Sequence, residues 1–368
     1  MQMIRDWFRR RFSDPQVVVL VVLLLLGAGA ILVLGNMLAP VLASVVIAYL
    51  LEGPVGLLQR GKLPRMAAVV LVFLLFLVFL FFLFFGLFPI LWQQVVQLFQ
   101  QLPSWITWFQ RELIRLPELY PDFISEQFVL DLFGVIKTEL TQLGQRILSV
   151  SVASVTGIIT ILVYMILMPL MVFFFLKDKK RLLEWATGFL PKERGLARQV
   201  WEEVNYKIGS YVRGKVWEIF IVWAVSYGTF TLLGLDFAIL IGLFVGLSVL
   251  VPYIGAAVMA LPVVLVAYFQ WGWSAQVAYV LGAYLVIQLL DGNLLAPLLL
   301  SEIVKLHPVA IIVAILVFGG WWGFWGVFFA IPLATLVQAL IKALSRTRQV
   351  EEASAQDRAP DGEKEQAA

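Results

Sequence analysis

Polar residues able to bind an ion or a polar solute lie close together near the end of the chain, in the stretch Gln288-Leu-Leu-Asp291-Gly-Asn293. Ionisable groups at membrane depth are costly and usually face a cavity or a substrate path, so Asp291 is the first candidate for a binding site. Gly292 and Pro297 would loosen a helix here and expose backbone carbonyl groups to an ion or a solute. In the alternative interpretation a membrane helix simply ends at Asp291. The same two interpretations apply to Asn293.

Three further positions carry groups with possible chemistry. His307 is the only histidine and could titrate near neutral pH, or it could cap a helix that starts at the following proline. Tyr253, in the sequence Val-Pro-Tyr-Ile-Gly, could line a solute path at a hairpin tip or anchor the chain at the membrane interface. Lys215 and Glu218 are three residues apart and are expected to form a local ion pair.

Catalytic signatures are missing from the sequence. The chain has one histidine and no cysteine, which excludes disulfides, thiolate metal sites and cysteine nucleophiles. It contains no zinc-binding His-Glu-x-x-His helix, no Gly-x-Ser-x-Gly elbow and no phosphate-binding loop. We therefore expect no catalytic residues, no metal site and no cofactor, and we predict that the protein is not an enzyme.

The composition predicts a membrane protein. Of the 368 residues 61% are hydrophobic and 14% are charged, whereas soluble domains have about 25% charged residues. Uncharged apolar runs long enough to cross the roughly 30 Å hydrocarbon layer recur along the chain. Such runs must be helical because lipid offers the backbone no hydrogen-bond partner, and the alternating pattern of a barrel is missing. The fold class expected is therefore all-α, a polytopic transmembrane helical protein.

Charge and proline positions divide the chain into segments. Basic residues gather at the N-terminus, around Arg60, Lys62 and Arg65, and after the fourth span, which predicts cytoplasmic N- and C-termini. They form no basic stripe with interleaved aromatics, so no nucleic-acid partner is expected. The predicted segments are a basic cytoplasmic N-terminus (1–15), three transmembrane helices (16–91), an extracytoplasmic amphipathic region (92–150), a transmembrane helix (151–177), a basic cytoplasmic helix or loop (178–215), a transmembrane core (216–342) that begins with a fifth span at 216–234, and a disordered cytoplasmic tail (343–368).

Two of these segments carry further predictions. The first two helices, at about 16–35 and 37–58, are joined so tightly that a hairpin is expected. In the amphipathic region Pro103, Pro117 and Pro121 are expected to break the chain into short helices. This region could be a cap or oligomerisation surface on the membrane, or a ligand-binding domain.

An internal repeat lies in the last third of the chain, at 235–270 and 306–342. Each copy is about 35 residues long, too long for one straight crossing, and is broken near its middle. Leu235, Asp236 and Gly255 align with Leu306, His307 and Gly326 at one constant offset, and the breakers are Pro252 and Gly255 in the first copy and Gly319, Gly320 and Gly323 in the second. Each copy is either a re-entrant hairpin, which we favour, or a strongly bent helix. Two such hairpins would form an inverted repeat, on which many secondary transporters build a midplane site.

Several short motifs in this order resemble the bacterial autoinducer-2 exporter family of PerM-like permeases. The motifs are Ala39-Pro40-Val41, Ala48-Tyr49-Leu50, Arg60-Gly61-Lys62-Leu63-Pro64-Arg65, Leu176-Lys177-Asp178, Tyr211-Val212-Arg213-Gly214, Val251-Pro252-Tyr253-Ile254-Gly255, Asp291-Gly292-Asn293 with Pro297, Leu306-His307-Pro308 and Ala330-Ile331-Pro332. The resemblance implies an inner-membrane permease of seven or eight helices and a homo-oligomer. Members of that family have been linked to autoinducer-2 export and others to sodium/proton antiport. The chain departs from the family pattern at Lys215, Trp217, Glu218 and Ala256, which leaves the cargo open.

These observations together predict a secondary transporter embedded in the lipid bilayer of the bacterial inner membrane. It would move a small polar solute or signalling molecule, with Na⁺ or H⁺ as the coupling ion, along a path lined by the two repeats and the Asp291 segment. One alternative is a cation/proton antiporter in which Asp291 binds the ion directly. The other is a membrane scaffold without transport, which would hold partners through the external helices and the basic loop.

Overall fold

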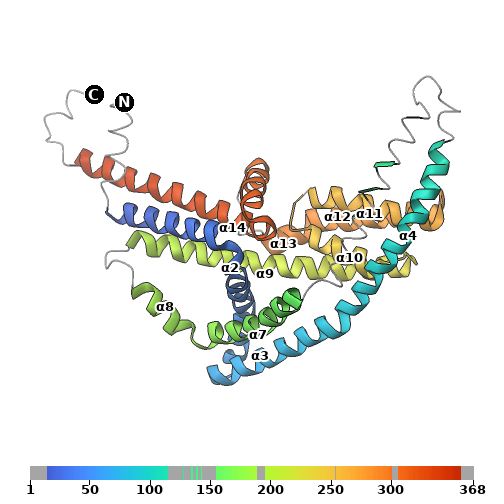
Figure 1. Ribbon diagram of the computed structural model, residues 1–368. Helices are drawn as coiled ribbons and strands as arrows, with labels where there is room; N and C mark the ends of the chain where they lie inside the picture. Colours follow the sequence, from blue (N-terminus) through green and yellow to red (C-terminus); the bar gives the residue numbers. More distant parts are fainter. Residues whose placement is uncertain are drawn as a thin grey trace, which may run out of the picture. The chain divides into compact units, whose positions relative to one another are not determined.

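The computed structural model describes residues 15–114, 127, 134–135, 138–139, 142, 155–188, 195–252, 254–300 and 306–357. This part of the chain consists of helices joined by short turns and contains no strand (Figure 1). Five helical stretches in it are long and apolar enough to cross a membrane. They are Met37–Arg60, Arg65–Trp108, Ile254–Trp271, Ala275–Leu300 and Pro308–Gln338. The prediction of an all-α polytopic membrane protein is confirmed.

The chain forms two compact units. Unit 1 comprises Met1–Lys62, Met171–Glu218 and Gly292–Ala368, and unit 2 comprises Leu63–Leu170 and Ile219–Asp291. The first copy of the internal repeat lies in unit 2 and the second copy lies in unit 1. Each unit is thus built around one copy of the repeat.

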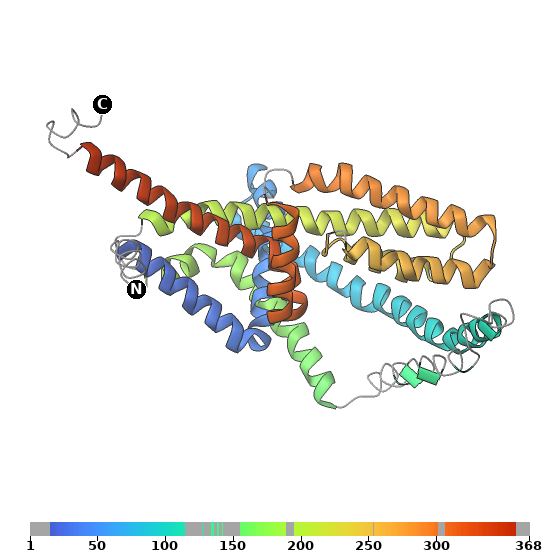
Figure 2. The same ribbon diagram turned by 90° about the horizontal axis from the view of Figure 1, so that it is seen from above.

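The longest N-terminal element of unit 1 differs from the expected pair of helices. Residues 15–60 form one helix, α2 (Pro15–Arg60), with Pro40 and Pro54 in its interior. Proline removes a backbone hydrogen bond and clashes with the preceding turn, which bends a helix without ending it when packing holds both sides. The change of direction along α2 is visible in Figures 1 and 2. The Ser44 hydroxyl donates a 2.6 Å hydrogen bond to the carbonyl of Pro40, and α2 packs against α14 (Pro308–Asp357).

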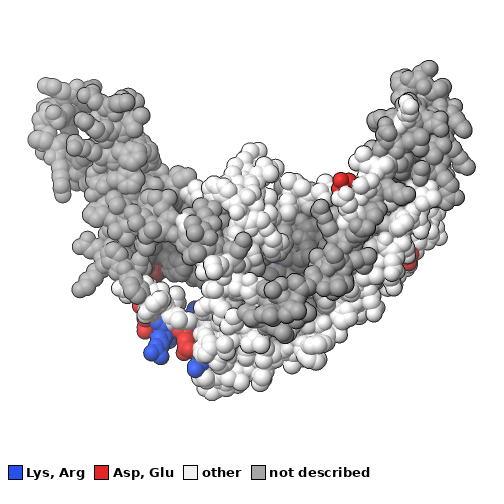
Figure 3. Space-filling model, in the orientation of Figure 1, with Lys and Arg blue, Asp and Glu red and all other residues white. Residues whose placement is uncertain are grey.

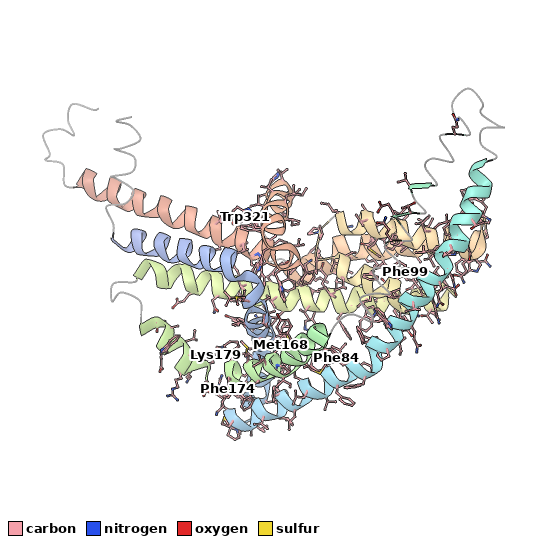
Figure 4. All side chains as sticks on the ribbon, in the orientation of Figure 1. Phe84, Phe99, Met168, Phe174, Lys179 and Trp321 are labelled. Carbon is pink, nitrogen blue, oxygen red and sulfur yellow. The ribbon has the colours of Figure 1, made fainter. Side chains whose placement is uncertain are left out.

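The basic segment after the fourth span is also helical. Helix α7 (Val155–Lys177) is followed by α8 (Lys179–Gly188) and by α9 (Gly195–Leu232), which joins the predicted basic segment and the predicted fifth span in one helix. Figure 3 shows Lys and Arg gathered over α8, and Figure 4 places Lys179 on that helix and Phe174 on α7. The Lys179 ammonium lies 3.2 Å from the carboxylate of Glu52 on α2.

In unit 2 a nearly continuous helix extends beyond the predicted third span. It consists of α3 (Arg65–Phe82), a π-helical turn η1 (Leu83–Leu87) and α4 (Phe88–Ile114). The expected break at Pro103 is wrong, because α4 continues through this residue. Trp105 stacks on Phe269 with 4.7 Å between ring centroids, so packing against α11 (Ile254–Trp271) supports α4 beyond the proline. Pro117 and Pro121 lie outside the described residues.

Two glycines allow close helix packing in unit 2. Helix α10 (Ala238–Ser248) carries Gly242 and Gly246, four residues apart on one face. A Cβ atom at Gly242 would lie 2.9 Å from the backbone nitrogen of Tyr227, and one at Gly246 would lie 2.8 Å from the carbonyl oxygen of Ile219. Small residues at this spacing let membrane helices approach until their backbones touch, and here they hold α10 against the second half of α9.

The C-terminal segment differs from the disordered tail expected from residue 343. Helix α14 continues to Asp357. The residues beyond 343 are mostly Ala, Arg, Gln and Glu, which have high helix propensity, and they follow directly on a formed helix that spares them the cost of nucleation.

Candidate transport site

The first copy of the repeat is a helical hairpin. Helices α10 and α11 pack against each other and are separated by a break after Ser248 that contains Pro252. The side-chain amide of Gln270, near the end of the copy, donates a 2.8 Å hydrogen bond to the carbonyl of Gly234 and accepts one of 2.8 Å from the backbone N–H of Asp236. Because these bonds join the two ends of the copy, the chain enters and leaves on the same side, which excludes the bent-helix alternative here.

A glycine is required where the hairpin turns. A Cβ atom at Gly255 would overlap the carbonyl oxygen of Ser248. The N–H of Gly255 donates a 2.8 Å hydrogen bond to the carbonyl of Val251, so the turn is tight and hydrogen-bonded. Any side chain at residue 255 would force the ends of α10 and α11 apart.

The second copy of the repeat turns in a similar way within unit 1. Helix α14 is interrupted at Gly323, whose φ of 58° and ψ of −134° lie outside the helical region. A Cβ atom at Gly326 would overlap the carbonyl oxygen of Phe318, as at the aligned Gly255 in the first copy. The rings of Trp322 and Phe329 stack across the break at 6.1 Å. Figures 1 and 2 show that the two parts of α14 run in different directions, and Figure 4 places Trp321 on the first part.

A polar stripe in unit 2 leads from the first hairpin to Asp291. The buried hydroxyl of Tyr284 on α12 (Ala275–Leu290) donates a 2.5 Å hydrogen bond to the carbonyl of Ala256, next to the turn. Its side chain also interacts with Gln288, four residues later, and Asp291 follows three residues further on. These spacings place Tyr284, Gln288 and Asp291 on one face of the helix.

The helix widens at the end of this stripe. Residues Asp291–Leu295 form a π-helical turn, η2, and the α-helix resumes as α13 (Ala296–Leu300). The turn begins six residues before Pro297, and the other π-helical turn, η1, begins six residues before Pro89. A proline clashes with the carbonyl four residues earlier, and one extra residue in the turn relieves the clash. The π-turn thus has a structural cause, and it also shifts backbone carbonyls out of the regular ladder next to Asp291.

The other predicted site residues are not members of the polar stripe. His307 is exposed, and its Nδ1 accepts a 3.3 Å hydrogen bond from the N–H of Val309, so it caps the start of α14. Asn293 is exposed and belongs to unit 1, whereas Gln288 and Asp291 are half-buried and belong to unit 2. Tyr253 lies outside the described residues. Among the described residues no group of three or more His, Cys, Asp and Glu side chains could hold a metal ion.

Sequence reasoning missed Tyr284 and the paired glycines of α10. Tyr284 stands four residues before Gln288, so a search for polar residues at helical spacing from Asp291 would have found it. The Gly-x-x-x-Gly spacing of Gly242 and Gly246 was a readable packing signal in an apolar segment.

The family model for AI-2E family transporter proteins matches residues 19–346 of the chain. The chain belongs to the AI-2E transporter family. It is 44% identical over 343 residues to permease PerM of Escherichia coli, and this match covers 93% of the chain and 97% of that protein. It is 27% identical over 322 residues to the transport protein YueF of Bacillus subtilis, covering 83% and 86% of the two chains. The names of these relatives state transport and specify no substrate.

Family membership and the five membrane-length helices make this AI-2E family protein a multi-pass membrane transport protein. The departures from the family pattern at Lys215 and Glu218 form an ion pair on α9, with 2.8 Å between Nζ and Oε2. This confirms the local pair expected from their spacing. Their side chains are buried, which their spacing alone did not indicate.

Proposed function

We propose that this AI-2E family protein is a secondary transporter of the bacterial cytoplasmic membrane that moves a small polar solute under an ion gradient. The observation that carries the proposal is the polar stripe of Tyr284, Gln288 and Asp291 on a helix of membrane-spanning length, hydrogen-bonded to the turn of a hairpin. Polar groups placed in sequence along a membrane helix usually face a substrate path.

The two hairpins support alternating access. Each unit contains one broken copy of the repeat, and in both copies an aligned glycine, Gly255 or Gly326, fits against the carbonyl of a residue before the turn. Paired discontinuous helices of this kind enclose the substrate site in many secondary transporters. We infer that both hairpins are re-entrant and that, within unit 2, the first hairpin lines the path together with Gln288 and Asp291.

The charge distribution supports cytoplasmic N- and C-termini. Lys179, Lys180 and Arg181 follow directly on the apolar helix α7, and Arg60 ends α2. Basic residues next to membrane helices are retained on the cytoplasmic side. The homo-oligomer implied by the resemblance remains a prediction, which native mass spectrometry in detergent would check.

Asp291→Asn tests the proposed path, and Asp236→Asn is the matched control because Asp236 is exposed at the hairpin entrance and lies outside the stripe. We expect uptake of the signalling molecule autoinducer-2 into proteoliposomes to fall at least tenfold in the Asp291 variant and to stay unchanged in the control. Equal uptake by both variants would refute the role of the stripe.

The same proteoliposomes separate the alternatives when sodium-dependent proton movement is followed with an internal pH dye. Proton flux that requires Asp291, with no solute uptake in the wild type, would favour the cation/proton antiporter. An unchanged proton flux in Asp291→Asn would remove the antiporter. A wild-type protein that moves neither solute nor protons would favour the scaffold.

A further inference from the structure

A buried ion pair lies on α9 within unit 1, outside the polar stripe. The side chains of Lys215 and Glu218 are 3% and 2% exposed, and 2.8 Å separates the ammonium nitrogen from the carboxylate oxygen. Taking two charges out of water has a large desolvation cost, which their attraction offsets only in a favourable geometry. Glu218 lies within the fifth span predicted from the sequence, and Lys215 immediately precedes it. Ionisable residues at such positions mark ion and proton pathways by default.

A third titratable group shares the same face of α9. Tyr211 precedes Lys215 by four residues and is fully buried, and its hydroxyl has no hydrogen-bond partner within the described part of the chain. The electrostatic influence of Glu218 extends to the Tyr211 phenol. Positions 211, 215 and 218 therefore form one buried polar row on α9.

The helices packed on this row contribute apolar contacts. From α13, the carbonyl oxygen of Leu299 and the side chain of Leu300 press on Gly214, where an added Cβ would lie 2.7 Å and 2.8 Å from them. From α14, the ring of Phe328 meets that of Tyr211 at 6.5 Å. None of these three side chains titrates.

Charged groups from α2 face a neighbouring part of α9. Tyr49 packs on Gly209, and its phenol senses the charges of Arg213 and Glu52. Arg213 is exposed, whereas the pair is buried. Among the described residues, the titratable groups near Glu218 include Lys215 and Tyr211 on its own helix. Arg213 lies between these two in sequence, and its charge acts on Tyr49 of α2, as does that of Glu52.

We propose that Lys215 and Glu218 form a proton-binding site that couples transport to the proton gradient; this rests on the proposed function of a secondary transporter. The carboxylate of Glu218 takes up one proton, and the pair changes from a neutral ion pair to a neutral acid beside an ammonium group. The buried ammonium of Lys215 then lies beside a neutral acid in place of a carboxylate, and access of water to the site stabilises the ammonium charge. Release of the proton to the other side of the membrane restores the ion pair and the packed conformation.

Infrared difference spectroscopy on the full-length protein in lipid tests the site without a transported solute. The spectrum is recorded as the pH is lowered, and the signal is the carbonyl stretch of a carboxylic acid that becomes protonated. We expect a band from a buried acid in the wild type, its loss in Glu218→Gln and its retention in Asp291→Asn. Glu218→Asp keeps a carboxylate and should shift the band without removing it. Absence of the band in the wild type, or its persistence in Glu218→Gln, would overturn the proposal.

A double variant separates coupling from a structural role. Lys215→Met with Glu218→Leu replaces the pair by apolar residues of similar size, an exchange that is often neutral or stabilising for folding. We expect this variant to fold and to lose proton-gradient-driven autoinducer-2 accumulation, while downhill movement persists. A folded double variant with wild-type accumulation and pH profile would show that the pair is structural only. If the band behaves as expected and no variant, including the wild type, moves the solute, the proton site stands and the proposed transport function fails.

Discussion

The break in α14 rests on one backbone conformation, which a pair of glycine substitutions can test. Gly323 has a φ of 58° and a ψ of −134°, whereas Gly320 lies three residues earlier within the helix. A Cβ atom added at either position would meet no atom within 4 Å. Gly323→Ala and Gly320→Ala therefore differ in backbone conformation and not in steric contact.

The expected difference in stability follows from this comparison. Alanine in place of glycine inside a helix stabilises it by about 0.8–1.0 kcal/mol, which applies at residue 320. A non-glycine residue held in a sparsely populated region of φ and ψ costs about 1–3 kcal/mol, which applies at residue 323. We expect the free energy of unfolding of the Gly323 variant to be lower than that of the Gly320 variant by about 2–4 kcal/mol.

The assay is reversible unfolding of both variants in mixed detergent micelles, followed by circular dichroism. Loss of autoinducer-2 uptake in Gly323→Ala, with uptake retained in Gly320→Ala, would extend the result from the fold to the proposed path. Equal unfolding free energies for the two variants would mean that residue 323 is helical. In that case α14 is one continuous helix, and the second hairpin does not exist.

Two packing predictions concern unit 2. Gly246→Ala should destabilise the protein by about 1–3 kcal/mol relative to Gly228→Ala. The new methyl group would meet the backbone of α9 at residue 246, whereas it would meet no atom within 4 Å at residue 228. Equal unfolding free energies for the two variants would contradict the close approach of α10 to α9. Trp105→Ala should destabilise α4 beyond Pro103, since it removes the stacking on Phe269. The rate of backbone amide hydrogen exchange should then rise at 104–114 and stay unchanged in α3. An unchanged rate at 104–114 would show that the stacking on Phe269 does not stabilise this part of α4.

The membrane-length helices and the positions of the breaks could be predicted from the sequence because their causes are local. An uncharged apolar run is helical in lipid wherever it packs. The turn at Gly323 needs a residue that tolerates a positive φ, and the turn at Gly255 needs one without a Cβ atom. The constant offset between the two copies of the repeat was equally readable. Whether a proline ends a helix was less predictable. Pro40 and Pro103 lie inside continuous helices, because packing on neighbouring helices stabilises the helix on both sides of each proline.

The sequence by itself determined that the chain is an all-helical membrane protein with two glycine-broken repeats, because length, hydrophobicity and backbone propensity belong to each segment alone. Only the tertiary structure decided which polar groups meet. The hydrogen bonds from Gln270 to Gly234 and from Tyr284 to Ala256 connect residues on different elements, and no local pattern encodes them. The burial of Lys215 and Glu218 is likewise a property of the tertiary structure, in which Leu300 packs on Gly214 and Phe328 on Tyr211 along the same part of α9.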